Sequence, residues 1–206
     1  MTKMPLAIDR RRLLQSALGA AAALTLLPAC SPEKPSFQSV DLTGANYATG
    51  FSLLDQNGTL RTLKDSPGKV VVLFFGYTQC PDVCPTSMVE LAQVKKSLGA
   101  DGDKLQVIFI SVDPDRDTPE ILKAYMANFD PNFLALRPTL PELAAVAKDF
   151  KIYYKKVEGS VPGSYSMDHT AGSYVFDGKG HIRLFTRYGG GAELLVSDLR
   201  QLIKTS

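Results

Sequence analysis

The sequence is poor in the side chains that bind soft metals, because its 206 residues include three cysteines and two histidines. One cysteine, Cys30, lies at the end of the N-terminal leader described below, which leaves Cys80 and Cys84 as the thiols of the remaining chain. Structural zinc sites take four ligands, and the sequence offers no obvious fourth ligand beside two thiols and one imidazole. A peroxidase-like function is also disfavoured, because no resolving cysteine remains once Cys30 is assigned to the leader.

The chain also lacks a surplus of positive charge once this leader is removed. The whole chain carries a formal net charge of +2, and residues 1–29 hold four basic side chains and one acidic, or +3, so the rest carries −1. No basic patch with interleaved aromatic residues remains, which argues against a nucleic-acid partner. No internal repeat or low-complexity tract occurs. A composition of 45% hydrophobic and 21% charged residues over the whole chain predicts one globular domain after the leader.

Residues 1–29 have the features of an export signal. A run of three arginines at 10–12 precedes an apolar stretch at 13–27, which is too short for a comfortable membrane span. The segment Leu27-Pro28-Ala29-Cys30 resembles a bacterial lipobox, in which the cysteine is lipidated and becomes the first mature residue. We therefore predict that Cys30 is lipidated and that the protein lies on the periplasmic side of the bacterial cell membrane. Export by the twin-arginine or the general pathway stays open, and residues 30–48 are predicted to form a tether.

Cys80 and Cys84 follow an apolar run at 70–75 that predicts a buried strand. Pro81 and Pro85 are compatible with the first turn of a helix, so the pair is predicted at a strand-to-helix junction. The helix N-terminus is expected to lower the pKa of the thiols and to favour the thiolate. A spacing of four on one helix face allows a disulfide or one shared metal ion. A purely structural disulfide is disfavoured, because closing so short a loop removes little entropy from the unfolded chain.

The order of the predicted elements indicates an α/β domain over residues 49–206 with a thioredoxin-like fold. The turn Asp55-Gln56-Asn57-Gly58 separates two short apolar runs and predicts an extra N-terminal β-hairpin. A second buried strand is predicted at 105–110, parallel to the first. Helices are predicted from the cysteine motif to about residue 98 and at about 117–129, 141–150 and 192–203. A later antiparallel hairpin is predicted with strands at 174–176 and 182–185.

His169 is the histidine predicted to join the two thiols. Functional groups gather at the carboxyl ends of parallel strands in such a sheet, and the segment 166–170 is predicted to be a loop that leads into the later hairpin near the cysteines. His181 lies in the turn of that hairpin, where we expect it to be exposed. Two thiolates and one imidazole form a soft site that suits copper as Cu(I) or Cu(II). We therefore predict that Cys80, Cys84 and His169 bind one copper ion per domain.

Three motifs stand out in the sequence: GYTQCPDVCP at 76–85, SVDPDRDTP at 111–119 and DHT at 168–170. Together they resemble the Sco/SenC family of copper proteins, which assist the assembly of cytochrome c oxidase. The resemblance extends over residues 51–203 and implies a copper metallochaperone for the dinuclear copper centre of the oxidase. The implied partners are the copper-site subunit of the oxidase and other periplasmic copper carriers, with membrane attachment through the lipid anchor.

An alternative function uses the same two thiols. In this hypothesis Cys80 and Cys84 are a redox-active pair that forms a disulfide when oxidised, and the protein is a thiol–disulfide oxidoreductase that reduces the cysteines of the apo copper site. His169 discriminates between the two functions, because a copper site needs a third ligand whereas a dithiol exchanger gains little from an imidazole. Whether the protein is an enzyme therefore stays open at this point.

Four further residues have candidate supporting roles. Asp82 could tune the charge of the thiolates or favour the helix N-terminus. Asp168 could accept a hydrogen bond from His169. Asp113 could contact the site or form the turn after its strand. Met88 has a soft sulfur one helical turn beyond Cys84, although core packing is the favoured interpretation.

Overall fold

The structure is a computed structural model that describes residues 36–205. The predicted export signal, Cys30 and the first part of the predicted tether lie outside the described residues. The compact unit Ser36–Ser206 contains every helix and strand described below. This unit has its own hydrophobic core, as expected of a part that folds independently. Within it, no helix combines the length and the apolar character needed to span a bilayer.

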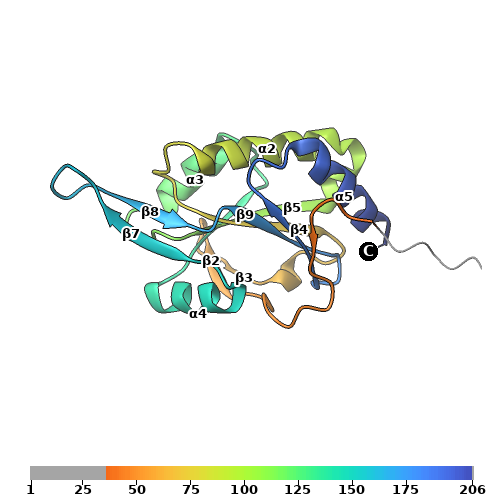
Figure 1. Cartoon of the computed structure of the whole chain (residues 1–206), viewed down its shortest axis with the longest axis horizontal. Helices are drawn as coiled ribbons and strands as arrows, with labels where there is room; N and C mark the ends of the chain where they lie inside the picture. The colour runs from red at the N-terminus through yellow and green to blue at the C-terminus, as the bar shows by residue number, and fades with distance from the viewer. Residues whose placement is uncertain (1–35, 206) are drawn as a thin grey trace, which may run out of the picture. The chain divides into compact units, whose positions relative to one another are not determined.

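An eight-stranded sheet forms the centre of this unit (Figure 1), in the order β1-β10-β9-β4-β5-β6-β2-β3. Parallel pairing joins β4 to β5 and β5 to β6, whereas β9 and β10 run antiparallel to their neighbours. Figure 1 shows α2 and α5 over one face of the sheet and α4 over the other. The strands are β1 (Val40–Asp41), β2 (Leu53–Asp55), β3 (Leu60–Arg61), β4 (Val70–Gly76), β5 (Leu105–Ser111), β6 (Leu134–Arg137), β7 (Tyr154–Glu158), β8 (Tyr165–His169), β9 (Gly172–Phe176) and β10 (Ile182–Arg187). The helices are η2 (Leu63–Asp65), α2 (Val83–Ser97), η3 (Gly99–Lys104), α3 (Pro119–Ala127), α4 (Leu140–Phe150) and α5 (Ala192–Thr205).

Strand β4 lies at the centre of the core, because its sequence VVVLFFG contains no polar side chain. All its residues are buried, as expected for a strand with helices on both faces of the sheet. The ring of Phe75 packs edge-on against Phe150 of α4, with 5.3 Å between the centroids, while α2 buries Met88 and Leu91. This packing fixes the end of β4, from which the cysteine motif continues.

The predicted α/β class and the parallel pairing of the two apolar strands are confirmed. The runs on either side of Asn57-Gly58 form β2 and β3, which pair antiparallel. Strand β2 also pairs with β6, so the two strands form one edge of the main sheet.

Two structural predictions made from the sequence are wrong. Residues 36–48 are folded onto the domain and do not form a tether: β1 pairs with β10, and the N–H groups of Gln38 and Ser39 each donate to the buried Asp198 carboxylate at 2.9 Å. The segment 166–170 is not a loop, because most of it belongs to β8, which pairs with β7 in a separate two-stranded sheet. Figure 1 shows this hairpin extending away from the main sheet.

Candidate metal centre

Cys80 and Cys84 lie on different local structures. Residues 77–82, which we call the cysteine loop, connect β4 to α2, and α2 begins at Val83 with Asp82 as its N-cap residue. Cys80 is therefore in the loop and Cys84 is in the first turn, so the prediction that one helix face carries both is wrong. Pro81 explains the difference, because the residue before a proline is disfavoured in helical conformation. The N–H of Cys84 donates to the sulfur of Cys80 at 3.4 Å, so this sulfur accepts a hydrogen bond at the helix N-terminus.

His169 is the last residue of β8, and its ring faces Cys84. The Nε2 atom lies 3.4 Å from the sulfur of Cys84, and Nδ1 lies 3.1 Å from the carbonyl oxygen of Thr170. A carbonyl can only accept a hydrogen bond, so Nδ1 carries the proton and the Nε2 lone pair is directed at the thiol. Asp168 is exposed on the opposite side of the strand. The backbone of Thr170, and not Asp168, therefore orients the imidazole.

The ligand atoms of Cys80, Cys84 and His169 all lie within 4.8 Å of one another. Both cysteines are free thiols. Cys84 is buried, whereas Cys80 and His169 are half-buried. The fold thus brings together two residues from the junction of β4 and α2 with a third from β8, and leaves Cys80 and His169 partly exposed.

Burial sets the protonation of this cluster. It raises the pKa of the Cys84 thiol strongly, and the neighbouring Cys80 adds to this effect. The expectation that the helix N-terminus lowers the thiol pKa is therefore wrong for Cys84, because desolvation raises this pKa more than the hydrogen bond with the Tyr77 backbone lowers it. Burial also lowers the pKa of His169, against a smaller opposite effect of its hydrogen bond to Thr170. At neutral pH the site contains a protonated Cys84 and a neutral imidazole.

Aromatic rings and one glycine enclose the cluster. Phe74 and Tyr77 lie edge-on to the His169 ring, with centroid distances of 6.1 and 5.9 Å. Gly76 ends β4 directly beneath Cys84. A Cβ atom at this position would lie 2.9 Å from the Cys84 sulfur and 2.7 Å from the ring of Phe109, which is closer than packed atoms approach.

The substitution Gly76→Ala is therefore expected to displace Cys84 and to lower the free energy of unfolding by about 1–3 kcal/mol, the usual cost of overpacking a core. Urea unfolding of the reduced protein measures this loss. Gly190→Ala is the matched control, because an added Cβ there meets no atom closer than 3.4 Å. Equal stability of the two variants would contradict the packing described for Gly76.

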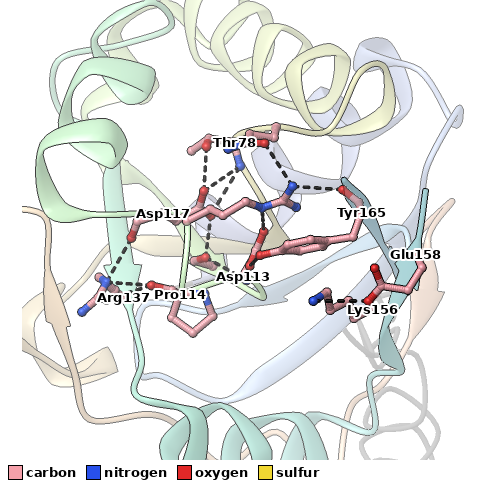
Figure 2. Close-up of polar contacts among 11 residues, drawn as sticks. Thr78, Asp113, Pro114, Asp117, Arg137, Lys156, Glu158 and Tyr165 are labelled. Atoms are coloured by element: carbon pink, nitrogen blue, oxygen red, sulfur yellow. Dashed lines mark hydrogen bonds and ion pairs between the residues drawn. The ribbon is translucent and has the colours of Figure 1, made fainter. Parts of the chain in front are cut away.

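Asp117 is a buried residue whose role the sequence did not indicate. Its carboxylate accepts hydrogen bonds from the hydroxyl groups of Thr78 and Ser111, each at 2.6 Å, and from the N–H of Thr78 (Figure 2). Burial raises the pKa of Asp117, partly offset by these hydrogen bonds. The sequence indicated only a helix start at this position, and Thr118 is the residue that caps α3. Asp117 instead attaches the cysteine loop to the end of β5.

The other residues considered from the sequence have clear positions. Met88 is fully buried in the core, in agreement with the packing interpretation. Asp82 is exposed at the start of α2. The side chain of His181 is 74% exposed, as predicted, and lies beside Asp177 in the β9–β10 turn. Asp113 is buried and accepts a hydrogen bond from the hydroxyl of Tyr165 at 2.9 Å, so it contacts the hairpin that carries His169.

Comparison with known proteins identifies relatives over most of the chain. The sequence profile of the SCO1/SenC family matches residues 40–204. A SCO2-like protein of Rickettsia felis is 34% identical over 166 residues, which cover 79% of this chain and 81% of that protein. The mitochondrial SCO2 homologue of Mus musculus is 34% identical over 204 residues, covering 94% of this chain and 79% of that protein.

Solved structures of similar proteins include copper-bound ones. Bradyrhizobium japonicum ScoI with copper bound is 43% identical, with a TM-score of 0.68 over 74% of this chain and 97% of that one. A SCO1/SenC family lipoprotein of Bacillus anthracis is 27% identical, with a TM-score of 0.65 over 77% and 98%. BsSco, a member of the Sco family of cytochrome c oxidase assembly proteins in which a disulfide switch was identified, is 25% identical, with a TM-score of 0.62 over 79% and 96%.

Proposed function

This chain belongs to the SCO1/SenC family, and we propose that it binds one copper ion through Cys80, Cys84 and His169 and delivers it to the dinuclear copper centre of cytochrome c oxidase. The observation that carries the proposal is the convergence of two sulfurs and one imidazole nitrogen within 4.8 Å. The similarity to a copper-bound ScoI supports it. Thiolates select Cu(I) and imidazole also suits Cu(II), so this donor set can retain copper in both oxidation states.

The difference in burial between the ligands suits hand-over of a cargo ion. Cys84 is inaccessible to solvent, whereas Cys80 and His169 are partly exposed. A ligand of the receiving protein can therefore approach from the side of Cys80 and His169 and replace them first. Because the Cys84 thiol is protonated in the free protein, copper uptake releases its proton, and the affinity for copper is expected to rise with pH.

Thiol–disulfide exchange is the second candidate function, because both sulfurs are free and close together. In this reaction the two thiols form a disulfide and lose two electrons and two protons, which reduce a disulfide of the apo copper site. The disulfide switch described for BsSco supports it. The exchange requires no imidazole, so His169 remains the residue that discriminates between the functions.

A transfer experiment tests the proposal. The reduced domain from Ser36 onward, loaded with Cu(I), is mixed with the reduced, metal-free copper-site subunit of the oxidase. Copper delivery predicts that the ion moves to the subunit, as measured after the two proteins are separated. If the loaded domain retains its copper but the metal-free domain reduces an oxidised subunit, thiol–disulfide exchange replaces copper delivery as the function.

We also propose that the protein is exported and held at the periplasmic face of the membrane by lipid on Cys30. The lipobox-like sequence and the Bacillus anthracis lipoprotein of the same family support this proposal. Cys30→Ala is expected to move the protein from the membrane fraction to the soluble fraction, because the lipid and not a protein span anchors it. Fractionation of cells measures the shift. A variant that stays with the membranes would indicate an uncleaved signal anchor instead.

A further inference from the structure

The hairpin that carries His169 is held to the domain mainly by its inward face. Among the described residues, β7 and β8 pair only with each other and do not join the main sheet. Tyr165, Met167 and His169 are half-buried on one face of β8, whereas the residues between them are exposed. Strand β9 begins at Gly172, so the chain ties the His169 end of β8 to the main sheet but does not set the direction of the hairpin or the position of the His169 ring. Side-chain contacts must hold the other end, at Tyr165.

Arg116 is a residue that contacts both ligand-bearing segments. Its Nη1 donates to the side-chain oxygen of Gln79 in the cysteine loop at 3.0 Å, and to the backbone carbonyl of Tyr165 in β8 at 2.9 Å. Its guanidinium lies over the ring of Tyr165, 3.5 Å from the centroid. One side chain thus connects the loop that carries Cys80 to the strand that carries His169.

Asp113 fixes Arg116 in this position. One of its carboxylate oxygens forms an ion pair with Nε of Arg116, and the other accepts the hydroxyl hydrogen bond of Tyr165 (Figure 2). The side chains of Asp113 and Arg116 are 4% and 20% exposed, so water competes weakly for these groups. Asp113, Arg116 and Tyr165 form a closed ring of contacts, which we call the hairpin clasp.

We propose that Arg116 is a positioning residue, which holds the hairpin in the orientation that places His169 beside Cys84. This inference rests on the proposed function, since it assumes that His169 binds copper. Loss of Arg116 keeps all three ligands but releases the hairpin, so the affinity for Cu(II), which relies on imidazole, falls more than that for Cu(I). Residues that orient metal ligands commonly contribute about 10–100-fold to affinity, and we expect a loss in this range for Cu(II) in Arg116→Gln.

The position of the hairpin can be measured without copper, by NMR of the reduced, metal-free domain. The rings of His169 and Tyr77 are 5.9 Å apart and edge-on, so nuclear Overhauser contacts between them are expected in the wild type. Arg116→Gln is expected to lose these contacts and to speed amide hydrogen exchange in β8. Arg183→Gln is the matched control, because Arg183 pairs with Asp177 at a similar exposure, 19% and 10%, beyond the opposite end of β4.

Two more variants keep the test decisive. Tyr165→Phe removes the hydroxyl that donates to Asp113 but keeps the ring, so it opens the clasp without removing a packed side chain, and it is expected to weaken the same contacts to a smaller degree. Arg116→Lys retains the charge but not the planar fork, and is expected to recover part of the Cu(II) affinity. Should Arg116→Gln unfold, Tyr165→Phe decides the question alone.

The possible results separate this proposal from the proposed function. A folded Arg116→Gln variant that keeps both the ring contacts and the wild-type Cu(II) affinity overturns the clasp and leaves the copper proposal intact. If Arg116→Gln unfolds, the same result in Tyr165→Phe overturns the clasp. A wild type that binds no copper overturns the proposed function, and the NMR comparison still decides whether Arg116 positions the hairpin.

Discussion

The substitutions Cys80→Ser and Cys84→Ser are each expected to abolish tight copper binding by the reduced domain and the sulfur-to-Cu(II) charge-transfer absorption. Each removes a soft donor from a cluster of three, for which a hydroxyl is a poor replacement. The loss should exceed the roughly 10–100-fold effect of residues that only orient a ligand. Competition with a Cu(I) chelator measures the affinity, and visible absorption measures the sulfur–Cu(II) bond.

The control for these variants is Met88→Leu. Met88 carries the sulfur nearest to Cys84 along α2, but its side chain is fully buried in the core. The Met88→Leu variant should therefore bind copper as the wild type does. The change conserves volume and is expected to lower the free energy of unfolding by less than about 1.5 kcal/mol. Wild-type affinity in either serine variant would show that the assigned thiols do not form the site.

His169→Ala is expected to weaken Cu(II) binding most and to leave much of the Cu(I) affinity. Cu(II) is the harder ion and depends on the imidazole nitrogen, whereas Cu(I) can persist on two thiolates. Cells with this variant as their only copy should lose cytochrome c oxidase activity and regain it with added copper. The disulfide between Cys80 and Cys84 should still form, because it involves neither ring nitrogen.

The control for His169→Ala is His181→Ala, because the side chain of this second histidine is 74% exposed and lies beside Asp177. It should change neither copper affinity nor oxidase activity. Normal oxidase assembly in His169→Ala cells under copper limitation would contradict copper delivery and favour thiol–disulfide exchange.

The sequence predicted the parts of the fold that have a buried apolar pattern. The sequences of β4 and β5 are runs of mostly apolar residues, because both faces of these strands are covered. Strand β6 was missed since it has only four residues. Strands β7 and β8 were missed because most of their residues are exposed and thus carry no hydrophobic pattern.

The identity of the three candidate ligands was also available from the sequence, but their surroundings were not. Placing both thiols on one helix face ignored the effect of Pro81 on Cys80. The raised pKa of Cys84 depends on complete burial, which no local motif reports. Arg116 contacts Gln79 and Tyr165, which are 37 and 49 residues away, so only the folded chain shows their connection.

X-ray absorption at the copper K-edge tests the central claim most directly. The reduced domain is loaded with one equivalent of copper as Cu(II) and measured beside His169→Ala. The site described here predicts two sulfur neighbours and one imidazole nitrogen in the wild type, and loss of the imidazole scattering in the variant. One sulfur or none in the wild type, or identical imidazole scattering in both proteins, would contradict a copper site formed by Cys80, Cys84 and His169.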